Sequence, residues 1–410
     1  MTNPASPDGR PPVAYVRLMV ASVLCMIMFG AVQVMPAVCL EALGQELHLD
    51  LTQRGFFLSL RLAVLTACLL VVGHFAERPS KRIIFFWGLI ATALGQLLIA
   101  YAPNYERLII AVVVSGLGFG VVEAIINPLV AQLNPKRCAW ALNLLNGIFS
   151  LGLVMGALST GELLERGYGW RISFWLWMIP PAVCAILYLT PRYPAPTADL
   201  DELSLKPDVR SFLSQPLFWI LVVAMIMGGG CEAGLTLWGP NFCARELGAS
   251  ARGGAWTTIL YGVFMAVGRI GSGVIVGRFG TVRLMVVSAV LCGVVTFALM
   301  FVKTLPMAWG LFALGGLFVA CFWPTILAIA SENIAVGSTS LFSLLAAAGV
   351  TGCVIFPWAI GALGDAFGLR WAVIILPISM VLLIAMLLAA HRYVTSEKAA
   401  EPEVCVPSVL

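Results

Sequence analysis

The sequence predicts an all-α membrane protein with twelve transmembrane helices arranged in two pseudo-symmetric six-helix bundles. Of its 410 residues, 60% are hydrophobic and 11% are charged, whereas soluble domains carry roughly 25% charged residues. The mean hydropathy is +0.98. Polar or Pro/Gly-rich breaks divide the chain into apolar segments, and one loop pattern recurs about 200 residues later. These observations exclude an ordinary soluble protein and a disordered chain.

Each apolar segment is long enough to cross a bilayer, which takes about 20 residues. The first run is too long for the apolar region of a signal peptide, so it is interpreted as a retained span. The expected spans of the first half are 13–40, 53–76, 82–102, 105–133, 137–163 and 171–190. Those of the second half are 215–243, 253–277, 281–302, 306–331, 338–364 and 370–393.

The longest polar stretch, rich in Pro and Asp, separates the two sets of spans. We therefore expect an N-terminal bundle over 1–190, a cytoplasmic linker over 191–214, a C-terminal bundle over 215–393 and a disordered cytoplasmic tail over 394–410. Lys and Arg are more frequent in the loops on the side of the termini, so both termini are expected in the cytoplasm. Compact loops favour the inner membrane of a bacterium.

A loop repeat relates the two halves. The segment Gly73–Arg82 follows the second span, and Gly273–Arg283 follows the eighth. Two related halves with a binding site between them are typical of secondary transporters. Both loops resemble the signature of the major facilitator superfamily, a Gly-rich helix end followed by charged residues. This resemblance implies that Glu77 and Arg78, with Arg278 in the second copy, belong to an inner gate.

Four further segments resemble the fucose–galactose–glucose:proton symporter family within that superfamily. They read GLGFGVVEAIINPLVAQLNP in span four, ALNLLNGIFSLGLVMG in span five, GCEAGLTLWGPNF in span seven and GLFVACFWPTILAIASE in span ten. The residues that carry the resemblance are Glu123, Asn127, Pro128, Asn146, Glu232, Trp238, Pro324 and Thr325.

The resemblance implies uptake of a hexose-like sugar by alternating access, coupled to a cation, taken to be a proton. The chain departs from the family at one place. Fucose-transporting members have an aspartate before a Leu-Pro step in span one, where this chain has GAVQVMPAV, with Gln33 and no acid. Sodium coupling and uncoupled transport therefore stay open.

Glu123 is the strongest candidate for chemistry. A charged group in the middle of a span is costly and usually functional, and a carboxyl whose access alternates can take up and release a proton. Asn127 follows one helical turn later on the same face, so the pair could hold the hydroxyls of a polyol. The alternative is that Glu123 is paired permanently with a cation and only locks the bundle.

Arg61 lies near the middle of span two. It could pair with Glu123 and hold the carboxylate ionised. It could instead bind an anionic substrate, which would contradict a neutral sugar. Arg269 lies within GRIGSG in span eight, where a structural pair or a helix-end contact is expected.

Span seven holds the second candidate for proton coupling, Glu232, with a protonated interhelical hydrogen bond as the alternative. Trp238 could stack on the apolar face of a sugar or lie in an interfacial belt, and Asn241 shares its side of the helix. Trp323 in span ten is a further candidate for substrate binding, with core packing as its alternative.

Amides form the remaining candidates for substrate binding. Asn143 and Asn146 are three residues apart on span five, and Gln33 is in span one. Hydrogen bonds between helices are the alternative for all three.

The sequence contains no Walker A, GxSxG or HExxH motif, and its Cys and His lack zinc or disulfide spacing. We expect no enzyme activity, no cofactor and no metal. The expected partners are a sugar, a cation and the lipid bilayer, with no nucleic acid and a monomeric state. Export of amphipathic drugs, transport of an organic anion and a sensor with a transporter fold are the alternatives.

Overall fold

The computed structural model describes residues 13–73, 81–134, 138–189, 213–334 and 339–400, and every regular element in these ranges is a helix. The all-α class predicted from the sequence is confirmed. The first half contains α1 (Val13–Glu46), α2 (Leu51–Gly73), α3 (Lys81–Ala100), α4 (Tyr105–Leu133), α5 (Cys138–Glu165) and α6 (Trp170–Leu189). The second contains α8 (Pro216–Leu247), α9 (Ala251–Phe279), α10 (Thr281–Leu299), α11 (Leu305–Val319), α12 (Phe322–Asn333), α13 (Thr339–Phe367), α14 (Leu369–Ala372) and α15 (Ile375–Ala400).

In the described part of the chain, eleven segments are long and apolar enough to cross a membrane. The pairs α11–α12 and α14–α15 each count as one such segment. The helix α2 is not among the eleven and carries Arg54 and Arg61, yet it packs between α4 and α13. With α2 included, the helices match the twelve predicted spans. The last helix continues to Ala400, beyond the end expected at residue 393.

Two expected spans are interrupted, and a proline explains each break. A proline has no N–H and its ring clashes with the carbonyl four residues earlier. Pro324 disturbs the carbonyl of Ala320, where α11 gives way to α12. Pro377 does the same at Val373, between α14 and α15. Gly280 alone joins α9 to α10, with a φ of 77° that favours glycine.

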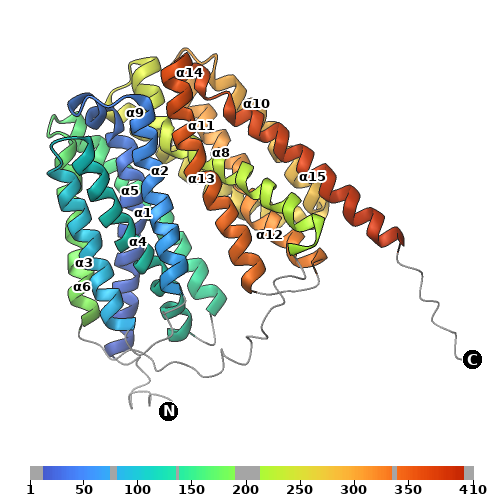
Figure 1. Cartoon of the computed structure of the whole chain (residues 1–410), viewed down its shortest axis with the longest axis horizontal. Coiled ribbons are helices and arrows are strands. Elements are labelled where there is room, and N and C mark those ends of the chain that lie inside the picture. Colours follow the sequence, from blue (N-terminus) through green and yellow to red (C-terminus); the bar gives the residue numbers. More distant parts are fainter. Residues whose placement is uncertain (1–12, 74–80, 135–137, 190–212, 335–338, 401–410) are drawn as a thin grey trace, which may run out of the picture.

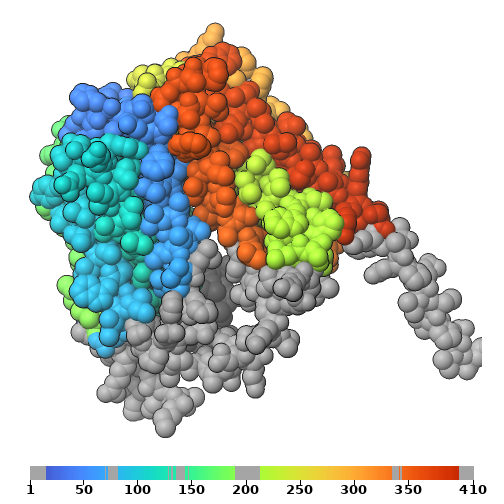
Figure 2. Space-filling model, viewed as in Figure 1, coloured from blue at the N-terminus to red at the C-terminus, as the bar shows by residue number. Residues whose placement is uncertain are grey.

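The two halves meet mainly through three helix pairs, α1 with α8, α2 with α13, and α5 with α9, and α1 also touches α9. In Figure 1 the halves come together around α9 and α14 and diverge toward the N-terminus and α12. Figure 2 shows the surfaces of α2 in blue and α13 in orange touching near the joined end. We call this joined end, where α1 and α8 finish and α2 and α9 begin, the closed end.

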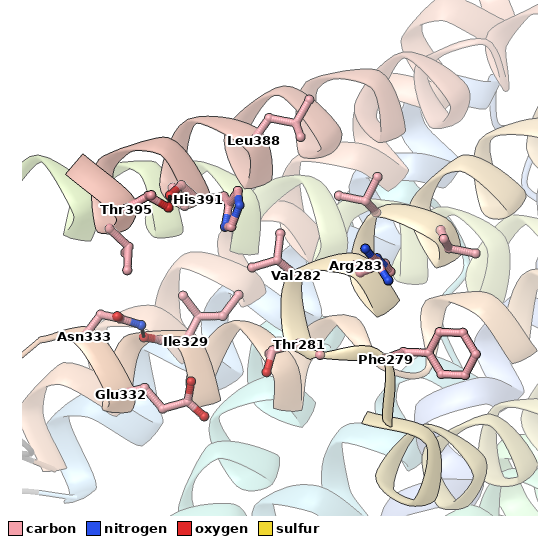
Figure 3. Close-up of a pocket in the computed structure, with 15 residues that line it drawn as sticks. Phe279, Thr281, Val282, Arg283, Ile329, Glu332, Asn333, Leu388, His391 and Thr395 are labelled. Carbon is pink, nitrogen blue, oxygen red and sulfur yellow. Dashed lines mark hydrogen bonds between the residues drawn. The ribbon is translucent and has the colours of Figure 1, made fainter. Parts of the chain in front are cut away.

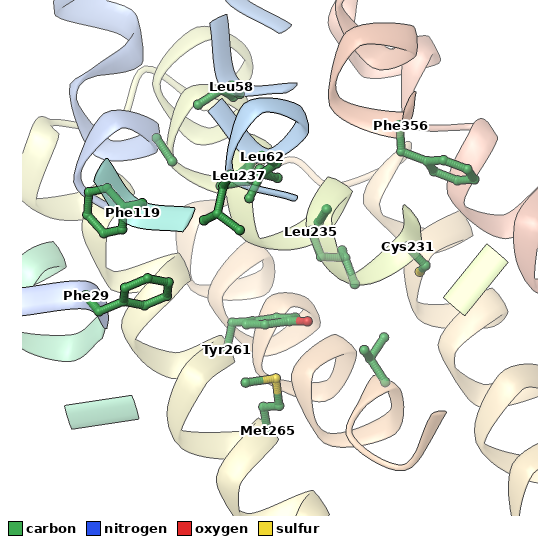
Figure 4. Close-up of a cluster of buried hydrophobic side chains, with 14 of the residues drawn as sticks. Phe29, Leu58, Leu62, Phe119, Cys231, Leu235, Leu237, Tyr261, Met265 and Phe356 are labelled. Carbon is green, nitrogen blue, oxygen red and sulfur yellow. The ribbon is translucent and has the colours of Figure 1, made fainter. Parts of the chain in front are cut away.

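Glycine permits the close approach of α2 and α13. A Cβ on Gly55 would lie 2.3 Å from the carbonyl oxygen of Pro357, and one on Gly361 would lie 2.2 Å from that of Leu51. Deeper in the molecule, apolar side chains from both halves form one core, which Figure 4 shows around Phe29, Leu237 and Tyr261. This packing positions the polar residues described next.

Candidate functional site

A cavity of about 300 Å³ lies between the two halves. Four residues predicted from the sequence line it: Gln33, Glu123, Glu232 and Trp323. The other lining residues are Phe29, Leu62, Leu65, Phe149, Leu153, Ala233, Thr236, Leu237, Tyr261, Met265, Arg269, Val350 and Cys353. The polar groups are concentrated on the C-terminal half, whereas the N-terminal wall is apolar apart from Gln33 and Glu123.

Glu123 reaches the cavity from α4, where Gly116, Gly118 and Gly120 allow that helix to pack tightly against α2 and α3. Its carboxyl forms no ion pair with any described residue. A half-buried carboxyl without a fixed cation can exchange a proton with the cavity. Asn127, one turn further along, is half-buried and is not among the described residues that line the cavity.

Glu232 enters the cavity from α8, opposite Arg269 on α9. The shortest distance between the guanidinium and the carboxylate is 3.9 Å, and the two side chains are 42% and 23% exposed, respectively. At this distance the two side chains form no hydrogen bond with each other. The pair is therefore loose and borders open space.

Two aromatic side chains complete this polar wall. The indole nitrogen of Trp323 lies near the carboxyl of Glu232, and the hydroxyl of Tyr261 lies near Thr236. Both atoms are buried, and neither forms a hydrogen bond of normal geometry with described residues. Tyr261 and Thr236 were not predicted, because in the sequence they look like ordinary residues of an apolar helix. Arg269 was assigned a structural role because glycines surround it.

Arg61 forms no ion pair with Glu123 in the described part of the chain. Its side chain is 6% exposed. It donates hydrogen bonds to the carbonyl of Val32 and to the carbonyl and the side-chain oxygen of Gln33, both of the latter at 2.9 Å. The guanidinium thereby fixes the side-chain oxygen of Gln33, a residue that lines the cavity, and no described residue accepts a hydrogen bond from its amide nitrogen.

Trp238 and Asn241 lie at the closed end and not among the described residues that line the cavity. Both are 1% exposed. The indole of Trp238 donates to the carbonyl of Pro357 at 3.0 Å, and the amide of Asn241 donates to Glu41 at 2.8 Å. In this conformation Asn241 joins the two halves, whereas Trp238 links α8 to α13 within the C-terminal half. Their role in substrate binding stays a prediction.

Of the remaining predicted residues, Arg278 is not among the described residues that line the cavity. Arg278 is exposed in the last turn of α9. Glu77 and Arg78 lie outside the described residues. Asn143 and Asn146 belong to α5, but their side chains also lie outside the described part.

Polar links between the halves seal the closed end, and the sequence analysis did not find them. The carboxylate of Asp365 accepts hydrogen bonds from the backbone nitrogens of Leu51 and Thr52 at 2.9 and 2.7 Å. Arg252 pairs with Glu162 at 2.8 Å, and its backbone nitrogen donates to Glu165 at 3.1 Å. Together with the bond between Glu41 and Asn241, these contacts join three helices of each half.

A second hollow of about 780 Å³ lies at the end of the C-terminal half where α9 meets α10 and where α12 and α15 finish. Figure 3 shows Arg283, Glu332 and His391 around it. It shares no described lining residue with the central cavity and contains no residue predicted for the site.

Comparison with known families decides the wider assignment. Residues 18–254 and 240–405 match the Major Facilitator Superfamily. The chain belongs to this superfamily. The resemblance to the fucose–galactose–glucose:proton symporter family within it stays a prediction.

Individual relatives in the superfamily are distant. The "Multidrug resistance protein B homolog" of Mycobacterium tuberculosis is 31% identical over 40% of this chain and 30% of its own length. The "Probable sugar efflux transporter" of Mannheimia succiniciproducens is 26% identical over 52% of this chain and 54% of its own length. The "Cyanate transport protein CynX" of Escherichia coli is 24% identical over 78% of this chain and 82% of its own length. The match thus spans about a third of the multidrug resistance protein homologue and about half of the sugar efflux transporter.

Solved structures agree on the fold. A bacterial homologue of the human lysosomal transporter Spinster, in an inward-facing, unoccupied conformation, superposes with a TM-score of 0.77 at 18% identity, covering 95% of this chain and 98% of that one. The nucleoside transporter NupG superposes with a TM-score of 0.74 at 11% identity, covering 93% and 100%. At these identities the similarity establishes the fold alone.

Proposed function

We propose that this protein is a secondary active transporter that moves a small organic solute across the membrane by alternating access, coupled to a proton. One observation carries the proposal: Glu123 from one half and Glu232 from the other line the same cavity between the halves. A buried acid inside a membrane protein is costly and points to an ion pathway.

Alternating access requires that one end be sealed by contacts that can break. The closed end supports this requirement because its links between the halves are hydrogen bonds and ion pairs, such as Asp365 with Thr52 and Arg252 with Glu162. Such contacts can be exchanged for bonds to water at low net cost. The same end contains the loops that the charge pattern places outside the cell, so this conformation corresponds to one that faces the cytoplasm.

We further propose residues 1–190 and 215–393 as the two moving bundles, 191–214 as the cytoplasmic linker and 394–410 as the cytoplasmic tail of a monomer in the inner membrane. Both termini then lie in the cytoplasm, and the solute enters the cell together with the proton. The linker and tail lie largely outside the described residues.

A hexose-like sugar is the substrate predicted from the sequence. The cavity volume of about 300 Å³ lies at the lower end of the range for small-molecule sites. Gln33 and the indole of Trp323 offer donors to hydroxyl groups. One relative carries sugar efflux in its name. Sodium coupling and uncoupled movement are the alternatives for energetics, and an organic anion or a drug are the alternatives for substrate.

Uptake into proteoliposomes tests this function. Purified protein is given an inward proton gradient, and separately an inward sodium gradient, with labelled fucose, galactose, glucose and a set of small organic acids. Accumulation of any solute above its external concentration under the proton gradient supports the proposal. Accumulation under the sodium gradient alone would replace the proton by sodium, and no movement of any solute would overturn the proposal.

A further inference from the structure

We propose that Arg269 binds a carboxylate of the substrate, so that the transported solute is a small organic anion with an apolar body. This inference rests on the proposed function, since it takes the central cavity to be the transport site. It replaces the neutral sugar expected from the sequence by a charged solute.

The first argument comes from a comparison of arginines within the molecule. Arg370 donates to Glu246 at 3.0 Å and to the backbone carbonyls of Val302 and Glu246 at 2.6 and 3.2 Å. Arg61 likewise donates to the carbonyls of Val32 and Gln33. Both guanidinium groups make several hydrogen bonds of normal length to the protein, as expected for structural arginines.

Arg269 differs from both. Its side chain is 42% exposed, and its only ion pair with a described residue, Glu232 at 3.9 Å, is at the distance limit for such a contact. Among the described residues that line the cavity, it is the only cation. Its planar donors therefore remain available for a bidentate carboxylate, which is the partner that a guanidinium matches in shape.

The second argument is the presence of further donors on the same wall. The indole nitrogen of Trp323 and the hydroxyl of Tyr261 are buried and make no hydrogen bond of normal geometry with described residues, and both residues line the cavity with Arg269. Buried polar atoms are nearly always hydrogen-bonded in native proteins. A carboxylate beside Arg269 offers four lone pairs and would satisfy these donors.

The opposite wall determines the rest of the ligand. Apart from Gln33 and Glu123, it consists of Phe29, Leu62, Leu65, Phe149 and Leu153 from the N-terminal half. These side chains offer no hydrogen bonds to the hydroxyls on the far side of a sugar ring, so burying those hydroxyls there is unfavourable. An apolar or aromatic body attached to the carboxylate fits this wall.

The charge balance links this substrate to the proton. The groups that face Glu232 are Arg269 and Tyr261 on α9, Trp323 on α12 and Cys353 on α13. When the substrate carboxylate binds Arg269, Glu232 loses its cation. If one of the two acids that line the cavity, Glu123 or Glu232, then takes up one proton, the net charge of the cavity is unchanged. One carboxylate and one proton cross together, and transport is electroneutral.

Matched pairs of solutes test the inference on the wild-type protein. Benzoate is compared with benzamide, and glucuronate with glucose, because each pair differs mainly in the charged group. We expect benzoate to be accumulated under an inward proton gradient and to bind at least tenfold more tightly than benzamide. If glucose is accumulated and neither benzoate nor glucuronate is, the anion inference is overturned and the proposed function stays intact. If no solute moves, the proposed function itself fails.

Two substitutions with opposite expected effects sharpen the test. Arg269→Gln should weaken benzoate binding by about tenfold or more, since it removes the charged donors of the hydrogen bonds to the carboxylate, and Arg269→Lys should restore part of the binding. Glu232→Gln removes the internal competitor for Arg269 and should tighten benzoate binding. Arg107→Gln, at an exposed position on α4, is the control. Weaker benzoate binding in Glu232→Gln together with unchanged binding in Arg269→Gln would refute the inference.

Discussion

Arg61 donates a hydrogen bond to the carbonyl of Val32, which is the acceptor that Pro36 leaves without its helical donor. A proline inside a helix removes the N–H that would bond the carbonyl four residues earlier. A cation on α2 thus satisfies a break in α1. The buried Arg61 therefore links two helices of the N-terminal half, α1 and α2.

This relationship predicts an energetic coupling between Arg61 and Pro36. Arg61→Gln should lower thermal stability because the Val32 carbonyl is left buried and unbonded, at a cost of about 1–3 kcal/mol. Pro36→Ala restores the helical donor, so Arg61→Gln should cost less in the Pro36→Ala background. The measurement is a double-mutant cycle on the apparent Tm in detergent. Additive effects of the two changes would show that the contact contributes nothing.

Glu123 carries the next prediction. Glu123→Gln keeps the shape of the side chain and removes the exchangeable proton, so accumulation against a gradient should be lost while exchange of labelled for unlabelled solute continues. The measurement is uptake into proteoliposomes with and without an inward proton gradient.

Glu106→Gln is the matched control, because Glu106 is an exposed acid in the first turn of the same helix. It should accumulate solute like the wild type. Full accumulation by Glu123→Gln would instead place coupling at Glu232 or remove proton coupling altogether.

Sequence reasoning found the helices and part of the cavity for a physical reason. Length and hydropathy report directly on a span, and an acid such as Glu123 or Glu232 inside an apolar run is conspicuous. Contacts between the halves are different. Asn241 and Glu41 are separated by 200 residues, and Thr52 and Asp365 by 313. No local pattern encodes such pairings, so the closed end was not predicted.

The direction in which each side chain points from its helix was the other feature that could not be predicted from the sequence. Trp238 bonds to α13 within its own half, and Asn241 bonds to α1 of the other half. The helical periodicity of α8 cannot reveal either contact, because most of its residues from Ala224 to Cys243 are buried on every side. For Arg269 the sequence predicted a structural pair or a helix-end contact, and the structure places Glu232 at 3.9 Å from it, a partner that the sequence could not name. Proline positions were visible in the sequence, but the breaks at Ala320 and Val373 depend on how each helix packs.

Asp365 supplies a prediction for the closed end. Its carboxylate accepts two backbone hydrogen bonds from the first turn of α2 and a third from the hydroxyl of Thr52, at a helix end where negative charge is favourable. Asp365→Asn should shift the equilibrium toward parting of the closed end by about tenfold, since charge-assisted hydrogen bonds contribute roughly 1.5–3 kcal/mol. Hydrogen exchange of peptides covering the end of α5 and the start of α9 measures this opening.

Asp50→Asn is the control, because Asp50 caps the same turn of α2 from within its own half, through the backbone nitrogen of Gln53 at 2.6 Å. It should speed exchange in α2 and leave the α5 and α9 peptides unchanged. The same pattern in Asp365→Asn would mean that Asp365 stabilises only the helix end and not the contact between the halves.

Gly361 provides a steric test of alternating access. A Cβ at this position would lie 2.2 Å from the carbonyl oxygen of Leu51, a backbone atom of the other half. Gly361→Ala therefore forces α13 away from α2. The closed end should open, hydrogen exchange at α5 and α9 should rise, and net uptake should fall because the two ends are no longer closed in alternation. Gly310→Ala is the control, since a Cβ there meets nothing within 4 Å. Normal uptake by Gly361→Ala, with exchange rates like those of the wild type, would show that close contact of α2 and α13 is not required for the transport cycle.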